Sequence, residues 1–289
     1  MEEEIHRRVR EIVNDRVHGS TQIALHLLEF LSETLTRLEE SQVHRVLHEV
    51  LNIIKNRSSI ILPSNLVYIL EKAVDSSLKI TGRVNFRIIA ERLSKYYVDD
   101  IVRVVGNAFE VLKDYRKVFT LSYSSQVLNT LKKLRDVEVF MITGWPLFDG
   151  VRAFKELSSQ GLRVKIYPDS SILEAVCSSE AVLLGCDAIL TNGSMVNRSG
   201  SRLAGLICNE KSIPLYVVCD CMKLDFQHLW RPEIWGYDLE DIHMDFNVFE
   251  IVEASLITGY ISELGRDVPV DFVEKALRKI ESYPMALIS

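Results

Sequence analysis

From residue 117 onward, short β-rich runs alternate with helical segments, and this alternation constrains the fold more than any other feature of the chain. The β-rich runs are VFTLSY, VEVFMI, RVKIYP, AVLLGC and PLYVVC. Segments of helical pattern, such as SQVLNTLKKL and DGVRAFKELSSQ, lie between them. Parallel neighbouring strands need a crossover connection, so this order is typical of βαβ units. The pattern predicts a Rossmann-like parallel sheet over residues 111–289.

Residues 1–110 have a different pattern, in which apolar side chains recur at helical spacing. The segment 20–38 is an example, with Ile23, Leu27 and Leu31 on one stripe. Five such segments with short breaks predict a small helical bundle. We therefore expect an α/β protein in which an N-terminal helical bundle, residues 1–110, is followed by a Rossmann-like domain, residues 111–289.

Two later segments are harder to assign. The segment Phe226–Asn247 is rich in aromatic residues and has little periodicity, which favours a lid or an interface loop. Two closing helices are expected at Glu253–Leu264 and Val270–Ser282.

Charge and composition exclude several classes of protein. The net charge is −6, so we do not expect direct nucleic-acid binding by a broad basic surface. No apolar run approaches the length of a membrane span, and the charged start MEEEIHRRVREI does not resemble a signal peptide. The five cysteines lack paired metal-ligand spacing. We expect a cytoplasmic protein without a metal site, a cofactor or a membrane partner.

Most of the candidate ligand-binding residues lie in the stretch Val182–Ser201. Asp187 follows a buried apolar strand, at the end where open α/β sheets place their ligands. Asn192-Gly193 predicts a tight turn, and Ser199-Gly200-Ser201 opens an amphipathic helix whose N–H groups can hold an anion. Spacing alone favours a plainer interpretation, in which Asp187 is a solvated loop carboxylate and Ser199 an N-cap.

Three motifs in this stretch resemble the pattern G-x-D, N-G and N-[KR]-x-G-[ST] of a known family. They are Gly185-Cys186-Asp187, Asn192-Gly193 and Asn197-Arg198-Ser199-Gly200-Ser201. The family unites the alpha, beta and delta regulatory subunits of translation initiation factor 2B with the isomerases of methylthioribose-1-phosphate and ribose-1,5-bisphosphate. Further resemblances follow in the family's order, at Thr120–Ser125, Thr143–Gly150, Asp169 and Asn247–Gly265. The chain is identified as a member of this family, of archaeal type, and the resemblance implies the same two-domain fold.

The resemblance also implies which residues surround a ligand. In the isomerases a cysteine and the aspartate of G-x-D move a proton or hydride between C1 and C2 of the sugar. Here Asp187 matches the aspartate, whereas Ser122 replaces the cysteine and is a far weaker acid. Two arginines that bind phosphate in the isomerases are replaced in this chain by His18 and Leu62. We therefore assign no catalytic residue, although Asp187 and Ser122 occupy the family's catalytic positions. The expected ligand-binding residues are Ser122, Ser124, Asp187, Asn197, Arg198, Gly200 and Ser201.

Because residues that the isomerases use for catalysis and phosphate binding are replaced here, the sequence favours a binding and regulatory protein over an enzyme. The resemblance implies a homodimer or larger homo-oligomer, the alpha subunit of initiation factor 2 as a partner, and a sugar phosphate or nucleotide as ligand. A nucleotide base is expected to stack on Trp145 or Tyr123. The alternatives left open are an aldose-ketose isomerase of the ribose-1,5-bisphosphate type that uses Asp187 with a substituted acid, and a structural paralogue that pairs with a catalytic relative.

Overall fold

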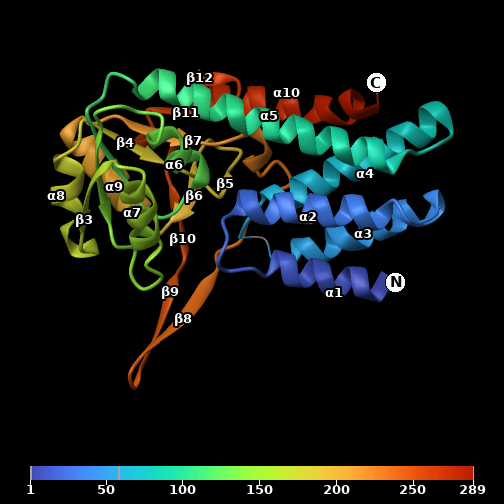
Figure 1. Cartoon of the computed structure of the whole chain (residues 1–289), viewed down its shortest axis with the longest axis horizontal. Helices are drawn as coiled ribbons and strands as arrows, with labels where there is room; N and C mark the ends of the chain where they lie inside the picture. Colours follow the sequence, from blue (N-terminus) through green and yellow to red (C-terminus); the bar gives the residue numbers. More distant parts are fainter. Residues whose placement is uncertain (1, 58, 289) are drawn as a thin grey trace.

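Helices dominate the first part of the chain. The computed structural model describes residues 2–57 and 59–288, and its N-terminal helices are stacked side by side at one end of the molecule (Figure 1). Each buries the apolar stripe that its sequence predicts, for example Leu27 and Leu31 in the second helix. The expected helical part is confirmed. Its helices are α1 (Glu2–Val13), α2 (Ser20–Leu35), α3 (Glu40–Lys55), α4 (Leu62–Thr81) and α5 (Phe86–Leu112).

A seven-stranded sheet, mostly parallel, forms the second part, and the expected Rossmann-like fold is confirmed. Its strand order is β12-β11-β7-β4-β1-β2-β3, with only β12 antiparallel to its neighbour. The strands are β1 (Lys117–Thr120), β2 (Glu138–Ile142), β3 (Arg163–Tyr167), β4 (Ala181–Leu184), β7 (Leu215–Val218), β11 (Gly259–Ser262) and β12 (Gly265–Asp267). The connecting helices are α6 (Ser125–Leu131), α7 (Asp149–Ser159), α8 (Ile172–Cys177) and α9 (Ser201–Lys211).

A three-stranded antiparallel sheet lies beyond the end of β4. It joins β5 (Ala188–Ile189), β6 (Met195–Arg198) and β10 (Phe249–Val252) in the order β10-β6-β5. The predicted turn at Asn192-Gly193 connects β5 to β6, and Gly193 has a φ of 80°, in the left-handed region that favours glycine. The turn places Asn197 and Arg198 back beside Asp187.

The predicted helix at Glu253–Leu264 is wrong. The segment contains a short 3-10 turn, Ala254–Leu256, followed by strand β11, which pairs in parallel with β7. Tyr260 and Ile261 are both fully buried, because β11 is covered on both faces. A strand buried on both faces has no polar alternation, so its sequence cannot be distinguished from a buried helix by periodicity.

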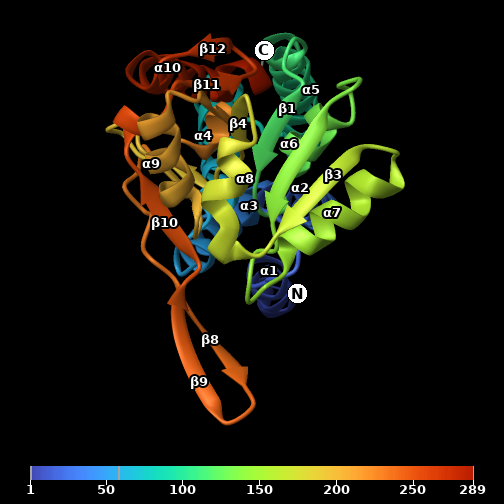
Figure 2. The same ribbon diagram turned by 90° about the vertical axis from the view of Figure 1, so that its left-hand side faces the viewer.

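The segment Phe226–Asn247 contains more regular structure than expected. It forms an antiparallel hairpin of β8 (Ile234–Leu239) and β9 (Ile242–Asn247). Figures 1 and 2 show this hairpin projecting away from the rest of the molecule.

The last helix, α10 (Pro269–Ile288), contains the predicted helix Val270–Ser282 and packs against α4 and α5. The N-terminal part therefore includes the end of the chain as well as its beginning (Figure 1). One continuous apolar core joins both parts, and Asn65 of α4 donates hydrogen bonds to the carbonyls of Met222 (2.7 Å) and Leu224 (2.8 Å). A division between residues 110 and 111 falls within the last turn of α5 and stays a prediction. No helix within residues 2–57 and 59–288 is long and apolar enough to cross a membrane.

Candidate ligand-binding pocket

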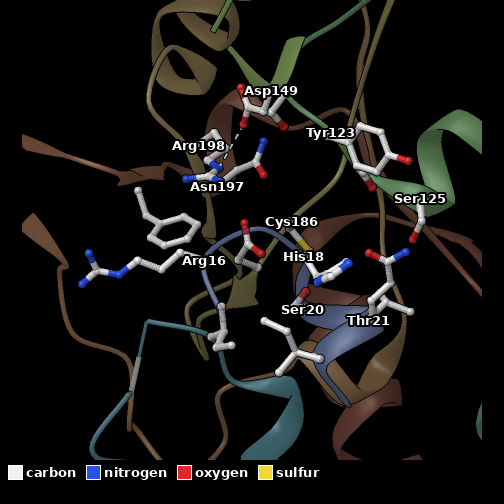
Figure 3. A pocket seen from close by; sticks show the side chains of 18 of the residues that line it. Arg16, His18, Ser20, Thr21, Tyr123, Ser125, Asp149, Cys186, Asn197 and Arg198 are labelled. Carbon is white, nitrogen blue, oxygen red and sulfur yellow. Dashed lines mark ion pairs between the residues drawn. The ribbon is translucent and has the colours of Figure 1, made fainter. Parts of the chain in front are cut away.

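A pocket opens where the carboxyl ends of β1 and β4 meet the start of α2. These strands are parallel neighbours, so the loops that follow them lie at the same edge of the sheet. The β1 loop contributes Ser122 and Ser124, and the β4 loop contributes Asp187. The second sheet adds Asn197 and Arg198 (Figure 3). Five of the seven predicted ligand-binding residues thus line one pocket.

Asp187 lies in the wall of this pocket and is only partly open to solvent. Burial raises the pKa of its carboxyl, while Lys223 and Arg198 lower it and the Ser20 side chain donates a hydrogen bond to it. The plainer interpretation of a solvated loop carboxylate therefore does not describe Asp187. A carboxyl with a raised pKa is suited to accept and return a proton.

The two serines occupy different environments. Ser122 is buried and has a φ of 60°, a left-handed conformation that is unfavourable for a residue with a side chain and recurs at functional sites. The Ser124 hydroxyl caps α6 by accepting a hydrogen bond from the Val127 N–H at 3.5 Å. A Cβ at Gly185 would lie 2.6 Å from that hydroxyl oxygen, which explains why the G-x-D motif has glycine here.

Arg198 is held by one carboxylate and two aromatic rings. Its Nε lies 3.2 Å from a carboxylate oxygen of Asp149, and its guanidinium lies over the rings of Phe249 (5.1 Å) and Trp235 (5.7 Å). Its Nη1 is buried and has no hydrogen-bond partner among the described residues. A buried donor without a partner costs free energy, so this atom marks a position that a ligand acceptor would stabilise.

Sequence analysis missed the residues that build the wall opposite the sheet. The loop between α1 and α2 is held by Arg57, which donates to the carbonyl of Asp15 at 2.6 Å, and by Arg152, which donates to the carbonyl of Val17 at 2.9 Å. Arg16, on the same loop, lies over the Trp235 ring at 4.7 Å. All three arginines line the pocket. They come from segments without a distinctive motif, so only the folded chain brings them together.

Lys223 is the other functional candidate that sequence analysis missed. It belongs to the 3-10 turn after β7 and is almost fully buried, with its Nζ donating to the carbonyl of Cys186 at 2.9 Å. Burial by itself lowers the pKa of Lys223, but Cys186, Asp220 and Asp187 outweigh burial and raise it. The residue is therefore an ammonium ion at the floor of the pocket.

The sequence around this pocket matches a known protein family. The model of the initiation factor 2 subunit family matches residues 16–267. The chain belongs to the initiation factor 2 subunit family.

Relatives in this family carry two kinds of name. An eIF-2B subunit 2-like protein of Pyrococcus abyssi is 24% identical over 283 residues, which cover 91% of this chain and 97% of that protein. A ribose 1,5-bisphosphate isomerase of Archaeoglobus fulgidus is also 24% identical, over 231 residues that cover 76% of this chain and 72% of the enzyme. Family membership therefore does not separate the regulatory from the enzymatic interpretation.

Solved structures of the family confirm the fold. Translation initiation factor eIF-2B of Pyrococcus horikoshii superposes with a TM-score of 0.83 at 20% identity, over 94% of this chain and 99% of that one. A chain of the tetrameric eIF2B-beta2-delta2 complex from C. thermophilum superposes with a TM-score of 0.75 at 13% identity, over 96% and 95% of the two chains. Members of the family therefore form oligomeric complexes.

The helix start that the family motif N-R-S-G-S creates is already occupied. The backbone N–H of Arg202 donates to the Glu250 carboxylate at 2.7 Å, and the N–H groups of Gly200 and Ser201 also face this carboxylate. The Ser201 hydroxyl accepts a hydrogen bond from Asn197 at 2.9 Å. Gly200 and Ser201 are not among the described residues that line the pocket. Their hydrogen bonds to Glu250 and Asn197 instead hold the start of α9 beside it. The protein's own carboxylate takes the place that we expected an anionic ligand to take.

Both aromatic residues expected to stack on a base already contact other side chains. Trp145 packs edge-on against Tyr237 of the hairpin at 5.5 Å and borders a separate hollow beside Trp230. The Tyr123 ring is covered by the guanidinium of Arg152 at 4.0 Å. Of the positions that lack the isomerase arginines, His18 lines the pocket, whereas Leu62 is fully buried in the core.

Within residues 2–57 and 59–288, no three His, Cys, Asp or Glu side chains are arranged to hold a metal ion.

Proposed function

We propose that this protein is a regulatory, ligand-binding member of the initiation factor 2 subunit family, with a role in translation initiation. Its ligand is a small phosphorylated molecule of the sugar phosphate or nucleotide class. The observation that carries this proposal is the buried Nη1 of Arg198, a charged donor without a partner in the described part of the chain.

The charge of the pocket supports an anionic ligand. Two carboxylates, Asp149 and Asp187, face a larger number of cations. The cations are Arg16, Arg57, Arg152, Arg198 and Lys223. Guanidinium groups bind phosphate oxygens through paired N–H donors, which suits a phosphoryl group near Arg198. Burying a phosphate here would relieve the mutual repulsion of the cations.

Neutral polar groups of the pocket suit a sugar. Ser122, Ser124 and Asn197 offer hydroxyl and amide groups beside the carboxyl of Asp187. Asp187 accepts hydrogen bonds from sugar hydroxyls when ionised, so its charge need not repel the ligand if the phosphate lies toward Arg198. In this arrangement the ligand lies with its sugar over the β4 loop.

We expect the protein to bind its ligand without converting it, because it lacks the acidic thiol of the isomerases. The isomerase resemblance requires a thiol at position 122, and this chain has a serine there, whose hydroxyl gives up a proton far less readily. A regulatory protein needs only the differential affinity of its ligand for one conformation or assembly.

An aldose-ketose isomerase of the ribose-1,5-bisphosphate type is the second candidate. It is favoured by Asp187, since burial raises the pKa of this carboxyl toward the range of a general acid or base. A relative is named for that activity.

We also propose a homodimer or a larger homo-oligomer, with the alpha subunit of initiation factor 2 as a protein partner. The hairpin β8–β9 supports the oligomer, because Ile234 and Ile242 are exposed by 66% and 61% on an element that projects from the molecule. Isolated two-stranded hairpins are only marginally stable in water, so a second copy packed on these side chains would stabilise it.

Calorimetric titration with ribose-5-phosphate, AMP and GMP tests the ligand proposal. Replacing one charged hydrogen bond removes about 1.5–3 kcal/mol of binding free energy, so Arg198→Ala should weaken affinity by roughly tenfold to a hundredfold. Arg202→Ala is the matched control, since Arg202 pairs with Glu253 outside the pocket. Circular dichroism would verify that both variants are folded.

Two outcomes contradict the proposal. One is that none of the three compounds binds the wild-type protein at millimolar concentration. The other is that a compound binds but Arg198→Ala, shown to be folded, binds it as tightly as the wild type does.

A further inference from the structure

Two cysteines occupy equivalent positions at the ends of neighbouring strands. In the parallel pair β4 and β7, Leu184 lies opposite Val217. Two residues further along each chain are Cys186 and Cys219. Cys186 lies just past the end of β4 and Cys219 just past the end of β7, so both follow from the same paired end of the sheet. All four residues belong to the same apolar core.

The spacing of the two cysteines suits a disulfide. The paired ends of neighbouring strands lie about 4.7–4.9 Å apart, so the residues that follow them start from a separation within the range of about 4.4–6.8 Å between Cα atoms that disulfides span. The Cys186 side chain also contributes, after burial, to raising the pKa of Cys219, as expected for two thiols that lie near each other. The two sulfur atoms therefore lie in direct reach of each other's electrostatic influence.

The pair is open to small molecules from one side only. Cys186 lines the ligand pocket and is labelled there in Figure 3, although its total exposure is only 4%. Cys219 has no exposed surface. A reagent that enters the pocket therefore meets Cys186 first and cannot reach Cys219 directly.

Lys223 supplies a positive charge beside the pair. Its Nζ is 2.9 Å from the carbonyl oxygen of Cys186, and its ammonium group interacts with the side chains of both Cys186 and Cys219. A cation beside the sulfur also stabilises the negative charge of a hydroxide that leaves a peroxide oxygen.

We propose that Cys186 and Cys219 form a reversible redox pair, with Cys186 as the thiol that a small peroxide oxidises and Cys219 as the thiol that resolves it. The Cys186 thiolate attacks one peroxide oxygen, the O–O bond breaks, and hydroxide takes up a proton to leave as water. Cys186 is now a sulfenic acid, and the peroxide has been reduced.

The second step joins the two strands. The Cys219 sulfur attacks the Cys186 sulfur, the S–O bond breaks, and the proton of Cys219 passes to the departing oxygen, which leaves as water. The balance is two thiols and one hydrogen peroxide giving one disulfide and two waters. Burial raises the pKa of Cys219 well above its usual value, so its proton has to leave as the sulfur attacks, and this makes the second step the slower one.

The remaining cysteines are placed differently. Cys177 is exposed at the end of α8, and Cys208 lies near it in α9. Cys221 is buried against the carboxylate of Glu263, and burial and this carboxylate raise the pKa of its thiol. Cys177 therefore serves as the accessible control, while Cys221 is the neighbour that must be distinguished from Cys219.

Oxidation of this pair would act on the pocket directly. Asp187 follows Cys186 in the chain, and Lys223 is bound to the Cys186 carbonyl. Tying Cys186 to β7 fixes the loop that carries Asp187. This consequence for ligand affinity rests on the proposed function, whereas formation of the disulfide does not.

The test is oxidation of the folded, ligand-free wild-type protein with dilute hydrogen peroxide, followed by alkylation and digestion without reductant. Trypsin, the glutamate-specific protease and the protease that cleaves before aspartate together isolate each thiol, because Glu180, Asp187 and Asp220 separate the cysteines. We expect the peptides Ala181–Cys186 and Ser212–Cys219 to be linked. The intact protein should lose the mass of two hydrogen atoms and regain it with dithiothreitol.

Variants make the assignment specific. Cys186→Ser and Cys219→Ser should each abolish the link, and Cys177→Ser should leave it unchanged. The inference is overturned if folded wild-type protein yields no link between those two peptides, or if the link joins Cys177 or Cys221 instead. Peptide mapping of the wild type decides the question even if a buried substitution prevents folding. The calorimetric titration with phosphorylated compounds is a separate measurement, so failure of one proposal does not imply failure of the other.

Discussion

Replacing Lys223 with methionine should destabilise the protein strongly, because this lysine neutralises two carboxylates that have little access to water. Lys223→Met keeps a similar side-chain volume but removes the ammonium group. Lys223 is 3% exposed, and its charge lowers the pKa values of Asp187 and Asp220, both of which burial raises. In the variant these carboxylates lose that cation, and the Cys186 carbonyl loses its donor at 2.9 Å.

Removal of one partner from a buried charged group typically costs about 3–5 kcal/mol. We expect the free energy of unfolding at pH 7.5 to fall by an amount of this order. The matched control is Lys113→Met, whose pair with Glu110 is exposed to solvent and should therefore contribute little to stability.

The loss should also depend on pH. Without Lys223, the folded-state pKa values of Asp187 and Asp220 rise further above the unfolded value of about 3.9, so the folded state binds protons that the unfolded state releases. Stability then falls as the pH rises through this window, and each pKa unit corresponds to about 1.4 kcal/mol. The destabilisation should therefore be larger at pH 7.5 than at pH 5.

Urea denaturation of wild type, Lys223→Met and Lys113→Met at both pH values measures these free energies. A loss below about 1 kcal/mol for Lys223→Met at pH 7.5 would refute the assignment of Lys223 as the buried counterion, given the expected cost of about 3–5 kcal/mol. An equal loss at pH 5 and pH 7.5 would refute the role of the two carboxylates.

Three further outcomes are expected. In coupled assays, ribose-1,5-bisphosphate and methylthioribose-1-phosphate should show no turnover, and turnover abolished by Asp187→Asn would establish the enzyme instead. Gly185→Ala places a methyl group 2.6 Å from the Ser124 hydroxyl oxygen and should lower thermal stability by about 1–3 kcal/mol, whereas an unchanged melting temperature would contradict this packing. Light scattering at micromolar concentration should detect a dimer or larger assembly that the double variant Ile234→Ser, Ile242→Ser weakens, and a monomeric wild type would argue against the hairpin as an interface.

Sequence motifs predicted the side of the pocket that the strand-end loops form, because those loops follow directly from short segments of the chain. A ligand-facing loop follows directly from a strand that ends, so Ser122 and Asp187 could be placed by finding the ends of two apolar runs. Asn192-Gly193 fixed the turn that returns the chain to Asn197 and Arg198. The family resemblance added the comparison with a cysteine at position 122, which composition and periodicity do not contain.

The sequence also misled at specific points, each for a physical reason. The N–H groups before Arg202 were expected to bind a ligand, but Glu250, distant in the chain, occupies them through the pairing of β10 with β6. Tyr260 and Ile261 looked helical because a strand covered on both faces carries no alternation.

What the sequence by itself determined was the alternation of strands and helices, the N-terminal helices, the family and the strand-end residues, since all of these depend on near neighbours in the chain. Only the tertiary structure decided which cations face Asp187. Arg57 and Arg152 come from different parts of the fold and meet at the loop between α1 and α2, while Lys223 reaches the β4 loop from the end of β7. Burial raises the pKa of Asp187, and the cations packed around it lower that pKa. Both effects depend on the packing of the whole molecule, so no single segment of the sequence contains them.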